Sequence, residues 1–198
     1  MAANTYLTPE ERAALESVRV GIAGAGGLGS NCAMHLVRSG VKHITIADFD
    51  VVNESNLNRQ FFFRDQIGQK KVEAIKANLL RIEPDADIRA VDMRLDASSA
   101  REVFADCGIV VEAFDAVDAK VMLVSAFASS GKKLVTASGL AGWGRSNAMR
   151  VRKMGNIVAI GDGETSVGKG VAPVSPRVGI AAAMEANAVV SLLLGCEP

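Results

Sequence analysis

The chain has 198 residues, of which 49% are hydrophobic, and its 22 lysines and arginines balance 22 aspartates and glutamates. This length fits one domain, and the hydrophobic content suffices for a packed core. The zero formal net charge argues against a protein that binds nucleic acid or a membrane surface through its overall field.

The sequence shows no targeting signal and no cysteine motif. No basic segment followed by an apolar run occurs at the N-terminus, so no signal peptide is predicted. No uncharged apolar run reaches the roughly 18–20 residues that a membrane-spanning helix needs, and a cytoplasmic protein is expected. The three cysteines, Cys32, Cys107 and Cys196, form no Cys-x-x-Cys pair, which predicts neither a zinc site nor a redox dithiol.

Strand and helix patterns alternate along the first two thirds of the chain. Thr8 can cap a helix, Pro9 suits its first position and Glu11 completes a capping box, so a helix is predicted up to about Ser17. Strands are predicted over residues 18–23, 43–47, 88–93, 109–113 and 133–137, and helices over 28–39, 68–82, 98–105 and 117–130. This alternation predicts an α/β fold with a Rossmann-like, doubly wound, mostly parallel sheet.

The pattern changes after residue 139. Segments 147–152 and 156–160 predict an antiparallel strand pair, the glycine-rich segment 161–170 is predicted to be mobile, and residues 177–194 predict a closing helix. No domain boundary is evident, so residues 1–198 are expected to form a single domain. Its parts would be an N-terminal helix (1–17), a nucleotide-binding core (18–139) and a short antiparallel extension with the closing helix (140–198).

A glycine-rich turn joins the first predicted strand to the next helix. It reads Gly-Ala-Gly-Gly-Leu-Gly over residues 24–29 and matches Gly-x-Gly-x-x-Gly in the strand–helix context typical of nucleotide binding. Backbone without side chains can approach phosphate, and the helix N-terminus offers free N–H groups. The turn fits NAD or FAD as well as ATP, because Asp48, at the end of the second strand, can hold the ribose of each. The candidate binding glycines are Gly24, Gly26, Gly27 and Gly29.

A polar loop over residues 48–60 follows the second predicted strand. Its two aspartates alternate around one phenylalanine, so both carboxylates can face one side of an extended segment. Two amides and a guanidinium then fall at one-turn spacing if the segment coils, and arginine suits bidentate contact with phosphate. Because the loop leaves the carboxyl end of a strand beside the glycine turn, a ligand-binding role is predicted. The candidate side chains are Asp48, Asp50, Asn56, Arg59 and Gln60.

Four sequence blocks resemble the ThiF/MoeB family, bacterial relatives of the ubiquitin-activating enzymes. They are Gly-x-Gly-Gly-Leu-Gly-Ser (24–30), Asp-Phe-Asp-Val-Val (48–52), Ser-Asn-Leu-Asn-Arg-Gln (55–60) and Gly-Gln-x-Lys-Val (68–72), in the family's order and spacing. The similarity resumes with Phe-Asp-Ala-Val-Asp (114–118) and ends with a Gly-Val-Ala-Pro-Val and Gly-Ile-Ala-Ala-Ala-Met-Glu-Ala pattern (170–186). It therefore covers residues 18–195, most of the chain.

The resemblance implies an enzyme that uses ATP and Mg²⁺ to adenylate the C-terminal glycine carboxylate of a ubiquitin-like sulfur carrier, releasing pyrophosphate. A ThiS-like carrier ending in Gly-Gly, a role in thiamine biosynthesis and a homodimer are implied with it. By motif, either Asp48 or Asp50 would hold the ribose, Asn56, Arg59 and Lys71 would contact the triphosphate, and Asp115 would bind Mg²⁺.

This chemistry suits the residue types in the motifs. A carboxylate is already a nucleophile at neutral pH, so no general base is required. The barrier is the approach of one anion to another, which cations, N–H groups and Mg²⁺ lower by neutralising charge. His35 and His43 are therefore predicted to be structural.

Three departures from the family pattern matter. The zinc-binding Cys-x-x-Cys pairs of many relatives are absent, so no zinc is predicted. Residues 130–195 contain no cysteine, so persulfide or thioester chemistry is expected from another protein. The N-terminal Arg-Tyr-x-Arg-Gln segment that reaches a partner subunit's ATP is also absent, which leaves Arg12 as its candidate replacement.

Other interpretations stay open at this point. Residues 163–170 approach a Walker A loop but end in Gly170, where that motif needs a hydroxyl for Mg²⁺, so a lid over the carrier's tail is expected instead. The chain could adenylate another carboxylate, as tRNA threonylcarbamoyladenosine dehydratases do. It could also be an NAD-binding oxidoreductase, which the glycine turn alone permits, or a non-catalytic module that binds the carrier.

Overall fold

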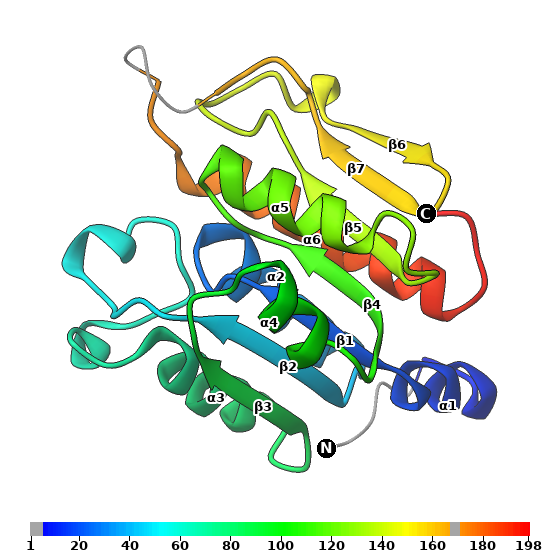
Figure 1. The fold of residues 1–198 in the computed structure, drawn as a ribbon. Helices are drawn as coiled ribbons and strands as arrows, with labels where there is room; N and C mark the ends of the chain where they lie inside the picture. Colours follow the sequence, from blue (N-terminus) through cyan, green and yellow to red (C-terminus); the bar gives the residue numbers. More distant parts are fainter. Residues whose placement is uncertain (1–5, 167–170) are drawn as a thin grey trace.

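A single twisted sheet organises the protein (Figure 1). The computed structural model describes residues 6–166 and 171–198. Within them, seven strands follow the order β3-β2-β1-β4-β5-β7-β6, and all neighbours pair in parallel except β6 and β7. The strands are β1 (Arg19–Ala23), β2 (His43–Asp48), β3 (Asp87–Asp92), β4 (Cys107–Glu112), β5 (Lys133–Ala137), β6 (Arg150–Met154) and β7 (Ile157–Gly161). The predicted α/β class, parallel sheet and antiparallel extension are confirmed.

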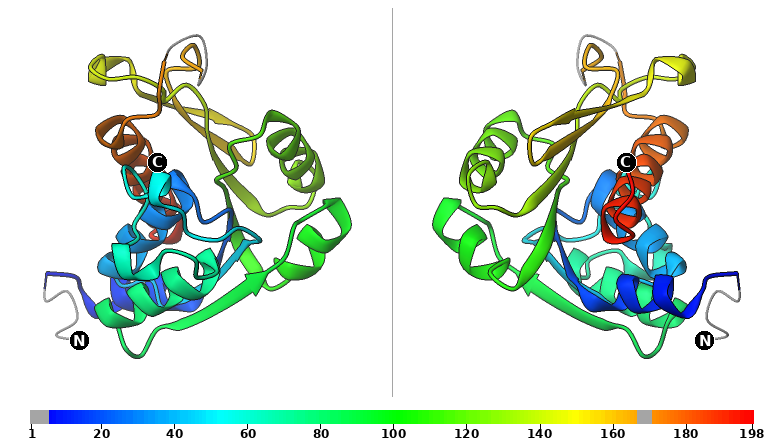
Figure 2. Two further views of the ribbon diagram at one scale, coloured as in Figure 1. Left: turned by 90° about the vertical axis from the view of Figure 1, so that its left-hand side faces the viewer. Right: turned by 90° about the vertical axis from the view of Figure 1, so that its right-hand side faces the viewer.

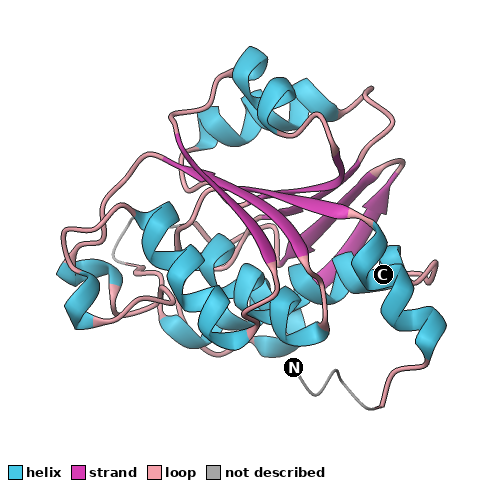
Figure 3. Ribbon diagram, turned by 90° about the horizontal axis from the view of Figure 1, so that it is seen from below, coloured by secondary structure: helices cyan, strands magenta, loops and turns pink. Residues whose placement is uncertain are grey.

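Helices cover both faces of the sheet (Figures 2 and 3). One core joins the sheet to the second, third and sixth helices, and a smaller core joins its other face to the fourth and fifth. The helices are α1 (Pro9–Ser17), α2 (Gly27–Ser39), α3 (Lys71–Ile82), α4 (Ala97–Val103), α5 (Val117–Phe127) and α6 (Ser175–Leu193). None of those in the described segments is long and apolar enough to cross a membrane.

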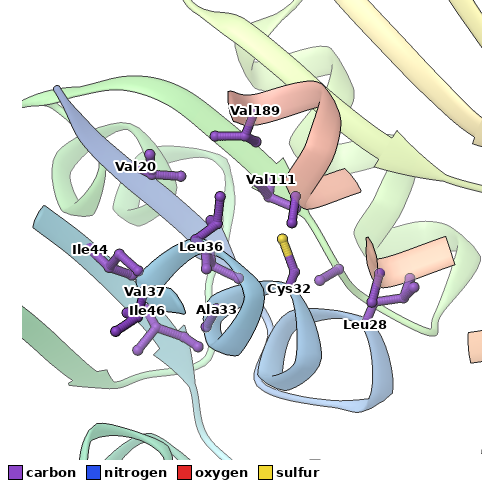
Figure 4. Packing of buried hydrophobic residues seen from close by; sticks show 14 of the residues in the cluster. Val20, Leu28, Cys32, Ala33, Leu36, Val37, Ile44, Ile46, Val111 and Val189 are labelled. Atoms are coloured by element: carbon purple, nitrogen blue, oxygen red, sulfur yellow. The ribbon is translucent and has the colours of Figure 1, made fainter. Parts of the chain in front are cut away.

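The larger core centres on α2, which packs beside α6 on one face of the sheet. Figure 4 shows Cys32 and Leu36 of α2 among apolar side chains that include Val111 of β4 and Val189 of α6. Central parallel strands are covered on both faces, so they consist of nearly continuous apolar residues rather than alternating ones. This packing fixes α2 and, with it, the glycine turn at its N-terminus.

Helix boundaries follow the local signals, with some shifts. The capping box of α1 is present: Thr8 Oγ1 accepts from the Glu11 N–H at 3.2 Å, and Glu11 Oε2 accepts from the Thr8 N–H at 2.8 Å. Gly40 ends α2 with a left-handed φ of 104°. The helix predicted from residue 68 begins instead at Lys71, because Gly68 has a left-handed φ of 87° and the carbonyl of Gln69 accepts from the N–H of Val52 (2.9 Å).

Two further elements are shorter or later than predicted. The helix predicted over 117–130 ends at Phe127 and continues as a turn. The first hairpin strand begins at Arg150, since Ser146–Ala148 form a 3₁₀ turn. The glycine-rich segment predicted to be mobile is described only up to residue 166, and residues 167–170 lie outside the described ranges.

Candidate functional site

The glycine turn lies at the carboxyl end of β1. Gly24 has a φ of 104°, and a Cβ atom there would lie 2.8 Å from the carbonyl oxygen of Ala113. A Cβ on Gly29 would collide with the carbonyl oxygen of Gly24, and one on Gly27 would lie 2.9 Å from Val178. At Gly26, by contrast, the nearest atom would be 3.9 Å away. Close packing therefore explains why positions 24, 27 and 29 carry glycine, whereas Gly26 leaves open space at the N-terminus of α2.

Asp48 ties the glycine turn to the polar loop. Its Oδ2 accepts from the N–H of Ala25 at 2.7 Å, and its Oδ1 accepts from the N–H of Asp50 at 2.8 Å. A carboxylate oxygen has two lone pairs, so each retains capacity for a ribose hydroxyl. The predicted ribose contact is thus sterically and chemically available, next to a turn that the same carboxylate stabilises.

Lys71 is buried and paired. Only 7% of its side chain is exposed, and its Nζ lies 2.7 Å from Oδ2 of Asp50, whose side chain is 50% exposed. Lys71 therefore does not belong to a solvated helix face. Of the two adjacent lysines, Lys70 is the exposed one, and its Nζ lies 3.2 Å from Oδ2 of Asp92. The structure thus separates the two lysines and directs Lys71 toward the loop after β2.

Arg59 and Gln60 overlie the glycine turn. The loop coils as expected, since the N–H groups of Arg59 and Gln60 both bond to the carbonyl of Asn56, at 3.2 and 2.9 Å. A Cβ on Gly27 would lie 3.5 Å from Cγ of Arg59. Arg59 Nη1 donates to Oδ1 of Asn58 at 2.8 Å. Gln60 is buried, and its side-chain oxygen has no hydrogen-bond partner within the described residues.

Asn56 is the other residue of this loop with a predicted phosphate contact. Its Oδ1 accepts from the N–H of Asn53 at 3.0 Å and so stabilises the loop's first turn. The amide NH₂ group is the part of this side chain that remains available to an anion. The structure thus gives the residue a local role beside the predicted one.

Two residues that the sequence analysis did not single out hold this loop on α2. Ser30 Oγ donates to the carbonyl of Gly26 (2.6 Å) and accepts from the N–H of Phe61 (3.0 Å). Asn31 Nδ2 donates to the carbonyls of Gly27 (2.7 Å) and Arg59 (2.9 Å). Their position directly after Gly29 was the sequence signal that could have identified them. Ser30 and Asn31 fix the turn that carries Arg59 above the N-terminus of α2.

Asp115 lies on the exposed loop after β4, at the same edge of the sheet. Within residues 6–166 and 171–198, nothing hydrogen-bonds to its carboxylate. A side chain of this kind fits Mg²⁺, which protein sites commonly hold through one or two carboxylates together with substrate phosphates. No group of three or more His, Cys, Asp or Glu side chains suited to a metal occurs in the described residues, so any ion here would depend on the nucleotide for most of its ligands.

A buried ionic network anchors the loop of Asp115. Glu112, the last residue of β4, has no exposed surface. Its carboxylate accepts from the N–H of Phe114 (2.7 Å), from Thr136 Oγ1 (2.6 Å) and from Lys120 Nζ (2.9 and 3.1 Å). Lys120 also donates to the carbonyl of Ala137 at 3.1 Å. The network thereby joins β4, β5 and α5 directly below the loop, and the sequence analysis did not identify it.

A second buried pair joins the loops after β5 and β7. Arg177 Nη2 lies 2.7 Å from Oδ2 of Asp162, and each side chain is 2% exposed. Arg177 also donates to the carbonyl of Gly144 at 2.8 Å. Burial alone would raise the pKa of Asp162, but the hydrogen bonds from Thr165 and Glu164 and the charge of Arg177 together lower it. The ionised pair fixes the N-terminus of α6 against both loops.

A third buried carboxyl, Glu185 of α6, has no such partner. Neither of its oxygens is hydrogen-bonded within the described ranges. Burial, with the charge of Glu112 nearby, raises its pKa well above the usual range, although Lys120 opposes the shift.

Burial likewise raises the pKa of the Cys32 thiol and raises that of Cys107 to about 11. Neither buried thiol is therefore activated as a nucleophile.

This arrangement is an α/β domain with a glycine turn and a polar loop at the carboxyl edge of the sheet, the features typical of nucleotide-binding folds. The ThiF family matches residues 2–198, and the chain belongs to this family. The predicted family is thereby confirmed.

Among curated proteins, the adenylyltransferase and sulfurtransferase UBA4 of Eremothecium gossypii is 35% identical over 127 residues, which cover 64% of this chain and 29% of that protein. The molybdopterin-synthase adenylyltransferase of Escherichia coli K12 is 29% identical over 92% of this chain and 75% of that protein. The chain spans 29% to 43% of the length of the first three curated relatives that it matches.

Solved structures share the fold. The tRNA N6-threonylcarbamoyladenosine dehydratase TcdA of E. coli, solved with AMP, superposes with a TM-score of 0.86 at 19% identity and covers 94% of this chain and 90% of its own. E. coli MccB with ATP gives a TM-score of 0.74 at 22% identity, covering 95% of this chain and 59% of its own. These likenesses place the same architecture in proteins that were crystallised with adenine nucleotides.

Proposed function

We propose that this protein is an ATP-dependent adenylyltransferase that activates the C-terminal glycine carboxylate of a ThiS-like, ubiquitin-like sulfur-carrier protein. The observation that supports it is one juxtaposition: the open glycine at the N-terminus of α2, the Asp48–Asp50–Lys71 cluster, Arg59 and Asp115 all lie at the carboxyl edge of neighbouring strands. The family's relatives carry adenylyltransferase in their names.

In this proposal, the chain's residues bind and polarise the triphosphate. Asp48 or Asp50 holds the ribose, and Gly24–Gly29 presents backbone N–H groups to phosphate. Asn56, Arg59, Gln60 and Lys71 surround the triphosphate from the loop side. Asp115 would hold Mg²⁺, which would supply positive charge to offset the charge developing on the leaving pyrophosphate.

The proposed chemistry forms an acyl–phosphate bond. An oxygen of the carrier's carboxylate attacks the α-phosphorus of ATP, and the bond from that phosphorus to the bridging oxygen breaks, so pyrophosphate leaves with the electron pair. No proton has to move, because the nucleophile is already an anion. Arg59 and Lys71 act by stabilising the transition state, since fixed cations need no reorganisation as charge develops.

The finer parts of the proposal concern partners and setting. We place the protein in thiamine biosynthesis in the cytoplasm, as a homodimer. Arg12 lies in α1, which precedes the amino end of β1, opposite the edge that bears the glycine turn (Figure 1). It therefore cannot serve its own subunit's nucleotide, and the proposal assigns it to a partner subunit's site.

Carrier-dependent exchange of labelled pyrophosphate into ATP tests the activity. The protein is incubated with ATP, Mg²⁺ and a ThiS-like carrier that a known adenylyltransferase accepts. The matched control is the same carrier without its last glycine. Exchange that requires the intact carrier is expected. No exchange with the verified carrier rejects the proposal, and tight binding of NAD without ATP by calorimetry would indicate the oxidoreductase alternative.

A further inference from the structure

The strand β6 forms one outer edge of the sheet (Figure 1). It lies beyond β5 and β7, away from the strands that carry the proposed nucleotide contacts. All five of its residues are exposed, and among the described strands only β7 pairs with it. The edge at β6 is therefore free, and a free edge presents unpaired backbone groups to other chains.

The turn between β6 and β7 fixes which backbone groups of β6 point outward. Met154 pairs with Ile157 across a turn of two residues, and a pair that closes such a turn exchanges both of its hydrogen bonds. Because antiparallel pairs alternate, the residues at even positions of β6 bond to β7, whereas the N–H and C=O groups of Val151 and Lys153 point away from it. In the part of the chain that the structure describes, no hydrogen bond engages these outward groups. An added strand can therefore extend the sheet at this edge.

The side chains of β6 are basic. The strand contains Arg150, Arg152 and Lys153, and neither β6 nor the turn that follows it contains an aspartate or a glutamate. Arg152 donates to the carbonyl of Asp162 at 3.3 Å, and Lys153 pairs with the exposed Glu197 at 2.8 Å. Among the described residues, Arg150 forms no ion pair. This edge therefore attracts acidic groups, although the whole chain has a formal net charge of zero.

The charges argue against a second copy of this chain as the partner strand. If two β6 strands paired antiparallel through their outward groups, the possible registers would place Arg152 opposite Arg152, Arg150 opposite Arg152, or Lys153 opposite Lys153. Like charges directly opposite each other destabilise a strand pair, whereas opposite charges stabilise it. Charged edge strands commonly prevent pairing between identical molecules in this way. The same charges leave the edge open to a strand that carries acidic residues.

We propose that the outer edge of β6 binds an extended, acidic strand of a different protein by β-strand addition. The backbone groups of Val151 and Lys153 supply the hydrogen bonds, and the cations of β6 pair with acidic side chains of the added strand. Val151, which is 39% exposed, offers an apolar contact between the charges. Because β5 and β7 separate this edge from the proposed nucleotide contacts, the inference goes beyond the proposed function and does not depend on it.

Fluorescence anisotropy with a labelled peptide of alternating glutamate and valine tests this surface, and a peptide of alternating lysine and valine is the control for charge. The wild-type protein is expected to bind the acidic peptide and not the basic one. Arg150→Glu should weaken binding about fivefold, because it turns an attraction into a repulsion. Val151→Pro should weaken it about tenfold, since proline removes an outward N–H while sparing the ladder to β7. Val151→Ala, which keeps that N–H, is the matched control.

Hydrogen exchange of the wild-type protein gives a readout that needs no variant, because the N–H of Lys153 should exchange more slowly when the acidic peptide is bound. Circular dichroism checks that each variant is folded. Failure to bind the acidic peptide, or equal binding of both peptides, overturns the proposal. If Arg150→Glu weakens binding while Val151→Pro binds as well as Val151→Ala, the attraction is ionic alone and the proposal is also wrong. A dimer that Val151→Pro dissociates in sedimentation would identify a second copy as the occupant instead.

Discussion

The loop after β2 and the loops after β4, β5 and β7 hold their positions in different ways. In the first, Asp48 and Asn56 bond to backbone N–H groups within the same edge, and Arg59 and Asp50 remain partly exposed. In the others, loop geometry depends on the buried carboxylates of Glu112 and Asp162, each paired with a lysine or an arginine. The comparison indicates that most of the candidate ligand-facing polar groups gather in one short segment, whereas the charges that position the other loops pair across different structural elements.

The largest expected effect is on the buried pair that fixes the loops after β5 and β7. Arg177→Ala should lower the unfolding free energy by about 3–5 kcal/mol, because it leaves Asp162 buried without its cation. Urea denaturation measures this. Replacing both members, by Arg177→Met with Asp162→Leu, should recover part of the loss; recovery is incomplete since Asp162 also accepts from the N–H groups of Glu164 and Thr165. A loss below 1 kcal/mol in the single variant would contradict the positioning role.

In the loop after β2, the effect should appear in activity rather than in stability. Arg59→Ala is expected to reduce carrier-dependent pyrophosphate exchange by about 100- to 1000-fold, the usual result of removing one fixed transition-state cation or donor. The unfolding free energy should change by no more than about 0.5 kcal/mol, as for other surface substitutions. Arg64→Ala, which removes an exposed arginine paired with Glu54, is the matched control. Equal rates of pyrophosphate exchange in the Arg59 and Arg64 variants would contradict the proposed difference between the loop after β2 and the other loops.

The network under Asp115 should show an intermediate effect on stability. Lys120→Ala leaves Glu112 buried with only the Phe114 and Thr136 donors, at an expected cost of about 2 kcal/mol. Lys120→Arg keeps the charge and should restore much of the loss. Thermal and urea unfolding measure both variants. If pyrophosphate exchange falls in Lys120→Arg and recovers at high Mg²⁺, the network acts on the position of the Asp115 loop. That result would sharpen the comparison between the two regions.

The smallest effect, taken per pH unit, concerns pH. The raised pKa of Glu185 means that the folded protein keeps a proton that the unfolded chain releases above about pH 4.3. The unfolding free energy therefore falls as pH rises toward the folded pKa, by up to about 1.4 kcal/mol per pH unit. Glu185→Met removes this titration, so its stability relative to the wild type should grow between pH 5 and pH 8.

Groups near Glu185 define the control for that measurement. The Cys32 thiol, whose pKa is also raised, stays neutral over this range and adds no slope. Glu185→Gln retains an unpaired polar group but cannot titrate, so its pH profile should match that of Glu185→Met at lower overall stability. Parallel profiles for the wild type and both variants would show that Glu185 is ionised in the folded protein.

Much of the fold was predictable because its signals are local. The capping residue Thr8, the stop at Gly40 and the apolar runs of the parallel strands each depend on a few neighbouring residues. The misplaced boundaries have long-range causes. The backbone of residues 68 and 69 is hydrogen-bonded to Val52, so these residues are not helical although their sequence pattern predicts a helix.

The sequence by itself determined the family, the sheet and the candidate residues of the loop after β2, because those residues act within short segments whose spacing is set by backbone geometry. The tertiary structure alone decided that Lys71 is buried against Asp50, that Glu112 and Lys120 underlie Asp115, and that Arg177 reaches Asp162 and Gly144. Such pairs form only when separate strands, helices and loops are packed together, and burial then favours opposite charges that can satisfy each other.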